Sequence, residues 1–152
     1  MRASFDHIGL SVADLDTQAA WYAKALGLHR RGRFEVASLS LRGEFVCSDE
    51  GWAIELLERH GSSGGLRAPD HATALLTQGY GHLCLRVDDV DAVCAALIAH
   101  GGAVRLAPQA APEPGVRMAF VSDPEGNLIE LIDRGGPIAA GLSGTAETGA
   151  VQ

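Results

Sequence analysis

Apolar and polar positions alternate along residues 5–12, and this period of two predicts a half-buried strand. Asp14 or Asp16 can cap a helix over about 16–26, and Gly27 is suited to end that helix. Three further strands are then expected, near 34–42, 44–48 and 52–58.

The second half of the chain repeats this order. A strand over 81–87 leads to a helix near 89–100, which Gly101 and Gly102 end. A turn at 123–127, rich in turn-forming residues, separates the last two of three further strands, near 103–107, 116–122 and 127–133. The pattern predicts an α+β protein built from two tandem βαβββ modules.

The two predicted modules are separated by a linker and followed by a tail. We expect the first module over 1–60 and the second over 80–134. Between them, 61–79 begins Gly-Ser-Ser-Gly-Gly and is predicted to be a linker with about one helical turn near 70–77. The segment 135–152 lacks periodicity and is expected to be a flexible C-terminal tail.

A histidine and a glutamate recur in phase between the two halves. His82 lies 75 residues after His7, and Glu130 lies 75 residues after Glu55. Each of the four stands in an apolar, strand-like run. Such internal repetition indicates a duplicated module that supplies one His and one Glu in each copy.

Strand geometry predicts where these side chains point, because successive side chains alternate between the two faces. In the first strand, Ile8, Leu10 and Val12 share the face that packs under a helix, which leaves His7 on the opposite, concave face. The same parity puts the other three repeated residues on a concave face: Glu55, His82 and Glu130.

Inward carboxylates are costly unless they are paired or bind a metal. Two imidazoles and two carboxylates suit one divalent ion per site (Zn, Ni, Co, Fe or Mn) and leave coordination positions open for a substrate. The structural alternative is that each inward Glu is salt-bridged, for example by Arg86.

The composition of the chain argues against some classes of binding partner. The chain has 152 residues, a net charge of −7 and 47% hydrophobic residues. This acidic balance argues against nucleic acid or an anionic membrane as a partner, and no apolar run is long enough to span a bilayer. The three cysteines form no CxxC pair, so we expect no disulfide framework and a cytoplasmic protein.

The chain resembles the vicinal oxygen chelate superfamily, which includes glyoxalase I, methylmalonyl-CoA epimerase, extradiol dioxygenases and bleomycin-resistance proteins. The resemblance covers about 5–134 and is carried by residues 6–15, Trp21-Tyr22, 26–28, 81–83 and 123–131. It implies a cupped mixed sheet around a divalent metal, commonly in a homodimer. The sequence leaves open whether the modules combine within one chain or between chains.

The nearest members by this resemblance are glyoxalase I and the epimerase. They imply a metal-dependent lyase or isomerase that acts on a small α-oxygenated carbonyl compound, or its thiol conjugate, through proton transfer. His7, Glu55, His82 and Glu130 align with the four metal ligands of glyoxalase I, and either Glu can serve as the catalytic base.

Other positions depart from glyoxalase I. Bacterial glyoxalases carry Arg where this chain has Ser11, and Asn where it has Arg59, so the identity of the thiol stays open. Trp21 and Gln18 also stand where those enzymes have Phe and a small residue.

Three alternative functions follow from the wider superfamily. An acyl-CoA epimerase of the methylmalonyl-CoA type fits the strand around Glu55. An Fe(II) extradiol-type dioxygenase requires a Tyr where Phe120 stands, and a non-catalytic drug-binding protein generally lacks a complete ligand set.

Three further residues are candidate substrate contacts. Ser11, Arg86 and Phe120 are expected at the substrate site, with Arg86 either binding a carboxylate or phosphate or balancing an acid such as Glu58. The remaining histidines fall in predicted loops or helix ends and are expected to be solvated or to cap helices: His29, His60, His71 and His100.

Overall fold

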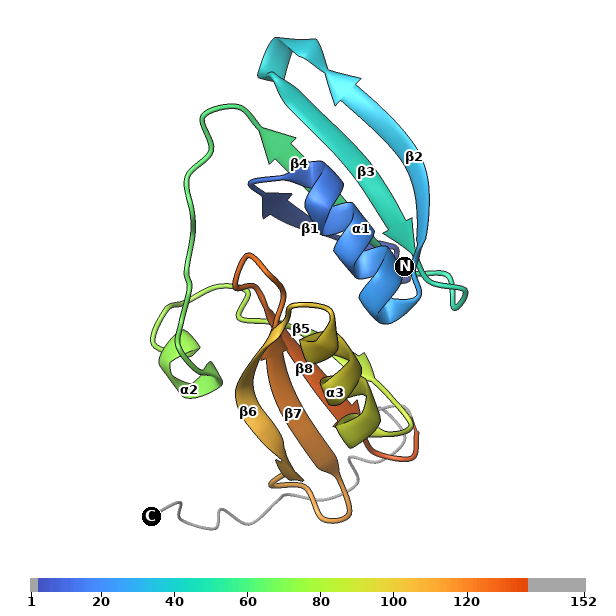
Figure 1. Cartoon of the computed structure of the whole chain (residues 1–152), viewed down its shortest axis with the longest axis vertical. Coiled ribbons are helices and arrows are strands. Elements are labelled where there is room, and N and C mark those ends of the chain that lie inside the picture. The colour runs from blue at the N-terminus through green and yellow to red at the C-terminus, as the bar shows by residue number, and fades with distance from the viewer. Residues whose placement is uncertain (1–2, 137–152) are drawn as a thin grey trace.

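A computed structural model describes residues 3–136. Each half of the chain folds as a strand, a helix and three strands (Figure 1). The first half contains β1 (His7–Val12), α1 (Leu15–Leu26), β2 (His29–Val36), the 3₁₀ turn η1 (Ala37–Leu39), β3 (Leu41–Cys47) and β4 (Ala53–Arg59). The second contains β5 (Leu83–Arg86), α3 (Val90–Ala99), β6 (Ala103–Ala110), β7 (Arg117–Ser122) and β8 (Leu128–Asp133).

Each half forms its own four-stranded mixed sheet. The strand orders are β1-β4-β3-β2 and β5-β8-β7-β6. In both sheets the first and last strands of the module are parallel neighbours, whereas the other pairs are antiparallel. The predicted α+β class and its two βαβββ modules are therefore confirmed.

Side-chain caps position the helices where the sequence predicts them. The Asp14 carboxylate accepts a hydrogen bond from the Thr17 N–H at 3.0 Å, and Gly27 ends α1 with a φ of 68°. Asp89 caps α3 in the same way through the Ala92 N–H. These contacts satisfy backbone groups that the helix itself leaves unpaired.

The prediction of one strand over 34–42 is wrong. β2 begins earlier, at His29, and the chain turns at Ala37–Leu39 before β3 begins at Leu41. The start of β2 is His-Arg-Arg-Gly-Arg and is exposed on both faces, so it carries no hydrophobic alternation. Pairing with β3 defines this strand, and local periodicity cannot reveal such pairing.

The main core is a continuous apolar cluster with side chains from both modules. Ile54 and Leu56 of β4, and Ile129 and Leu131 of β8, are 0–1% exposed. In each sheet these aliphatic residues flank a glutamate, which must then face the other side.

One buried hydrogen bond and a set of exposed ones join the two modules. The Tyr22 hydroxyl donates to the Asp123 carboxylate at 3.0 Å, and burial raises the pKa of Tyr22 well above its usual value. The Glu125 carboxylate accepts hydrogen bonds from the backbone N–H groups of Ala13 and Asp14. The turn between β7 and β8 is thereby attached to the start of α1.

The predicted linker and tail can be compared with the described residues. The short helix α2 (His71–Ala74) lies in the segment predicted to be a linker. The predicted tail over 135–152 lies outside the described residues from 137 onward. No helix within 3–136 is long and apolar enough to cross a bilayer.

We predict that Tyr22→Phe lowers the free energy of unfolding by about 1–3 kcal/mol, because it removes one hydrogen-bond donor from the buried Asp123 carboxylate. The measurement is a urea unfolding curve. Tyr80→Phe is the matched control, since the Tyr80 side chain is 100% exposed. Equal stability of the two variants would show that the Tyr22 hydroxyl does not hold the modules together.

Candidate functional site

The first histidine–glutamate pair lies on the parallel strands β1 and β4. His7 Nε2 is 3.6 Å from Glu55 Oε2. On the other side of the ring, His7 Nδ1 is 2.7 Å from the Asp6 carboxylate, and this hydrogen bond raises the pKa of His7. Asp6 thus orients the imidazole so that Nε2 faces Glu55.

The second pair has the same arrangement on β5 and β8. His82 immediately precedes β5, and its Nε2 is 3.1 Å from Glu130 Oε2. The hydrogen bond from His82 lowers the pKa of Glu130. The Glu55 and Glu130 side chains are 22% and 16% exposed, and no Arg or Lys of the described chain lies within ion-pair distance of either.

The two pairs do not meet within one chain. Across residues 3–136, no three or more His, Cys, Asp or Glu side chains lie close enough to hold a metal ion. The structure therefore brings each histidine to its own glutamate and leaves the two pairs separate. We call the His7/Glu55 and His82/Glu130 pairs half-sites.

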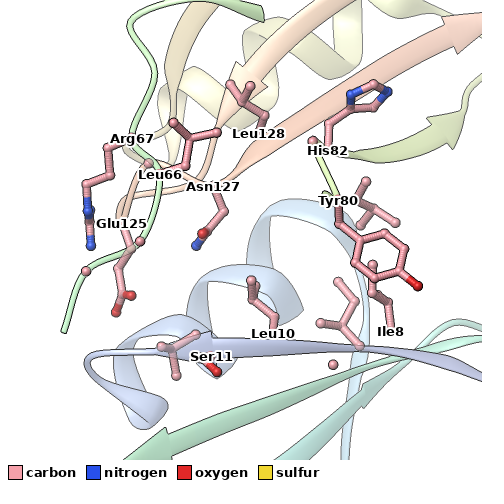
Figure 2. A pocket seen from close by; sticks show the side chains of 18 of the residues that line it. Ile8, Leu10, Ser11, Leu66, Arg67, Tyr80, His82, Glu125, Asn127 and Leu128 are labelled. Carbon is pink, nitrogen blue, oxygen red and sulfur yellow. The ribbon is translucent and has the colours of Figure 1, made fainter. Parts of the chain in front are cut away.

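A cavity of about 640 Å³ lies between the modules and reaches the histidine of each half-site. Its lining includes His7 and His82, but neither Glu55 nor Glu130. Figure 2 shows residues of β1 along one wall, residues of the β7–β8 turn along another, and Tyr80 beside Ile8. Ser11, an expected substrate contact, lines this cavity.

Arg86 is exposed at the end of β5 and forms no salt bridge with a described residue. The acid it was expected to balance, Glu58, pairs with Arg42 at 2.7 Å and accepts a hydrogen bond from the Leu15 N–H. The charge-balance role predicted for Arg86 toward Glu58 is therefore wrong, and the guanidinium is available to an anionic ligand.

Phe120 is 4% exposed and lies between two imidazoles. The His71 ring stacks on it with centroids 4.8 Å apart and planes 16° apart, and the His82 ring meets it edge-on at 5.1 Å. Nδ1 of His71 is buried without a hydrogen-bond partner. The expectation that His71 is solvated or capping is wrong, because its ring stacks on Phe120. The sequence could not show this, since only the tertiary structure places α2 against β7.

Cys84 lies on the same face of β5 as His82. Burial, together with the neighbouring Glu130 carboxylate, raises the pKa of the Cys84 thiol to about 12. The thiol is therefore protonated near neutral pH, so Cys84 is not an activated nucleophile.

The first half-site is bordered by aromatic rings. Phe45 of β3 meets the His7 ring edge-on at 5.5 Å, and Phe34 of β2 lies 5.8 Å from Phe45. A Cβ at Gly43 would collide with the Phe34 ring, so only glycine lets that ring lie flat on the sheet. Both aromatic residues lie within predicted strands, but local periodicity does not reveal that strand pairing brings them beside His7.

Comparison with known proteins decides the family. The profile described as Glyoxalase/Bleomycin resistance protein/Dioxygenase superfamily matches residues 4–131. The chain belongs to this superfamily. It is 33% identical to the lactoylglutathione lyase of Haemophilus influenzae over 84% of this chain and 90% of that one. It is 34% identical to the probable lactoylglutathione lyase of Vibrio parahaemolyticus, over 91% and 95%.

Solved structures of the superfamily have the same fold. The glyoxalase I of Zea mays superposes with a TM-score of 0.69 at 24% identity, over 87% of this chain. The match spans only 45% of the maize chain, which is therefore about twice as long. Together with the curated relatives, this makes the chain an enzyme of the glyoxalase-like superfamily, whose glyoxalases use a divalent metal.

Two positions that differ from bacterial glyoxalases lie in the interior of this superfamily member. Gln18 and Trp21 of α1 are 0% and 6% exposed, so neither side chain is available to a substrate. Arg59, by contrast, is exposed at the end of β4. Of these departures, only Arg59 and Ser11 can affect substrate recognition directly.

Proposed function

We propose that this protein is a divalent-metal-dependent lyase that acts on a small α-oxygenated carbonyl compound or its thiol conjugate through proton transfer. We further propose that it works as a homodimer, in which His7 and Glu55 of one copy and His82 and Glu130 of a second copy bind one metal ion. The observation that carries the proposal is the pair of separate, matching half-sites.

The donor set fits a divalent transition metal. Two imidazoles and two carboxylates suit Zn, Ni, Co, Fe or Mn, and their chemistry does not discriminate among these ions. The hydrogen bond from Asp6 to His7 is the kind of outer contact that orients a metal-binding imidazole. Each of these partly buried carboxylates pairs with a histidine and with no Arg or Lys of the described residues, and a histidine–carboxylate pair is suited to bind a metal ion.

A second copy of the chain can supply the two metal ligands that each half-site lacks. Two ligands hold a divalent ion weakly, and both half-sites have only two. A twofold-symmetric dimer would combine unlike half-sites twice and give two equivalent four-ligand sites. The double length of the maize glyoxalase I chain, which has room for a second unit of this fold, supports such pairing.

The bound ion would stabilise negative charge on two neighbouring substrate oxygens. The chain's own part is proton transfer, in which Glu55 or Glu130 takes a proton from the carbon beside the carbonyl and returns it to the adjacent carbon. A carboxylate is suited to this role, because it can accept a proton from carbon and return the same proton to the neighbouring atom.

The thiol conjugate is favoured by the relatives, which are named lactoylglutathione lyase. Ser11 and Arg59 replace two glutathione-contacting residues of the bacterial enzymes, so the thiol itself stays open. Arg86, Ser11 and Phe120 remain the proposed substrate contacts, with Arg86 able to bind a carboxylate or phosphate bidentately.

We predict that the metal-reconstituted protein converts hemithioacetals and leaves acyl-CoA epimers and catechols unchanged. Glu130→Gln keeps the side-chain shape but removes a carboxylate that we assign as metal ligand and candidate base. It should lower the rate by about 10²–10⁴-fold. The assays are product formation and oxygen uptake. Oxygen consumption with catechols by the Fe(II) form would favour the dioxygenase alternative instead.

We also predict that two inactive variants complement each other. His7→Ala/Glu55→Gln destroys the first half-site, and His82→Ala/Glu130→Gln destroys the second. Refolded together in equal amounts, they should recover roughly a quarter of the wild-type metal content, because half of the dimers are mixed and each mixed dimer regains one intact site.

Each variant refolded alone is the control and should bind no metal tightly. Mixed dimers that form and yet recover no metal would contradict pairing between copies. In that case the two halves of the site would have to come together within one chain.

A further inference from the structure

The cavity between the modules is lined by segments of a single chain. Its walls include β1, the β7–β8 turn and residues 62–68 of the segment between the modules. Its volume of about 640 Å³ is in the range of small-molecule sites in proteins, about 300–1,000 Å³. Neither Glu55 nor Glu130 lines it, so the cavity depends neither on the second copy nor on the metal that we propose.

One charge on the cavity wall has no counter-charge. Apart from the two histidines, the charged side chains of the lining are Arg67 and Glu125, and Figure 2 shows both on the side of the cavity away from Tyr80. The Glu125 carboxylate accepts hydrogen bonds from backbone N–H groups at 2.9–3.1 Å. Ion pairs between described residues engage other arginines but not Arg67. Its guanidinium is therefore an unneutralised cation in a chain whose net charge is −7.

Packing holds Arg67 at the cavity. The next residue, Ala68, is 6% exposed and lies in a small apolar cluster with Ala74 and Leu128. The Arg67 side chain also passes close to Gly126 in the β7–β8 turn, where an added Cβ would lie 3.5 Å from Arg67 Nη1. The guanidinium is thus positioned before a ligand arrives, which lowers the entropic cost of binding.

The rest of the lining combines hydrogen-bond donors with apolar surface. Ser62 and Ser63 line the same wall as Arg67, and the backbone N–H groups of 63–68 form no hydrogen bond with a described backbone group. Ile8 and Leu10 of β1 supply apolar surface. A guanidinium binds a carboxylate through two parallel hydrogen bonds. The cavity therefore suits a small molecule with an apolar body and one carboxylate.

We propose that the cavity between the modules binds a small monocarboxylate with an apolar body, and that Arg67 binds its carboxylate group. The apolar body lies against Ile8 and Leu10. Because the lining contains neither glutamate of the half-sites, binding requires no metal, and this site goes beyond the proposed function.

The test is a titration of the full-length, zinc-loaded protein with phenylacetate and with phenylacetamide, its uncharged counterpart, followed by amide NMR spectra. Phenylacetate should shift the amide signals of residues 62–68 and 125–128. Phenylacetamide should bind at least about tenfold more weakly, because it lacks the charge-assisted hydrogen bonds.

Arg67→Gln should weaken phenylacetate binding about tenfold and leave phenylacetamide binding unchanged. Arg31→Gln is the matched control, since Arg31 is exposed on β2 and does not line the cavity. Glu55→Gln/Glu130→Gln removes two proposed metal ligands without altering the cavity wall, and it should bind phenylacetate as the wild type does.

Wild-type affinity for phenylacetate in Arg67→Gln, or no binding by the wild-type protein, would overturn the inference. Loss of phenylacetate binding in Glu55→Gln/Glu130→Gln would assign the carboxylate to the metal and would overturn it as well. A lower urea midpoint of Arg67→Gln with weaker binding of both probes would do so in favour of a structural role. Arg67-dependent binding by a protein that takes up no zinc would support this inference and contradict the proposed function, so the two are tested separately.

Discussion

The alternation of side chains along four strands is the constraint on which the rest of the structure depends. In β4 and β8 the glutamates stand between aliphatic residues that are almost completely buried under a helix. The backbone then leaves each carboxylate only the opposite face, where it meets a histidine from the parallel neighbour, β1 or β5. Burial of the aliphatic residues supplies the free energy that holds these polar groups on a partly apolar surface.

The contacts between modules explain why one chain holds two half-sites. Tyr22 and Glu125 attach α1 to the β7–β8 turn, and the apolar cluster runs through both modules. Figure 1 shows α1 and α3 on the same side of their sheets, so the two opposite faces are not directed at each other. The fold thus uses the helix side to join the modules, and the second copy that we propose would meet the histidine–glutamate side.

The fold could be predicted from the sequence wherever local chemistry decides. The alternation of β1, the Asp14 cap and Gly27 predicted the first strand and helix, and the 75-residue repeat identified the polar members of both half-sites. The beginning of β2 could not be predicted, because its polar, doubly exposed residues depend on pairing with β3. The position of His71 could not be predicted either, because its stacking on Phe120 joins segments far apart in the chain.

The way in which the two half-sites are placed relative to each other could not be predicted from the sequence either. Strand parity predicts the face on which His7 or Glu130 lies, but it carries no information on which module faces which. That depends on contacts such as Tyr22 with Asp123, which are formed only in the folded chain.

A complete metal site, as we propose it, requires two copies of the chain. Native mass spectrometry of the zinc-loaded protein tests it most directly, because monomer and dimer are resolved with their bound ions. We expect two zinc ions on the dimer and none on the monomer that dissociates from it in solution. A monomer that carries its own tightly bound zinc ion would contradict it.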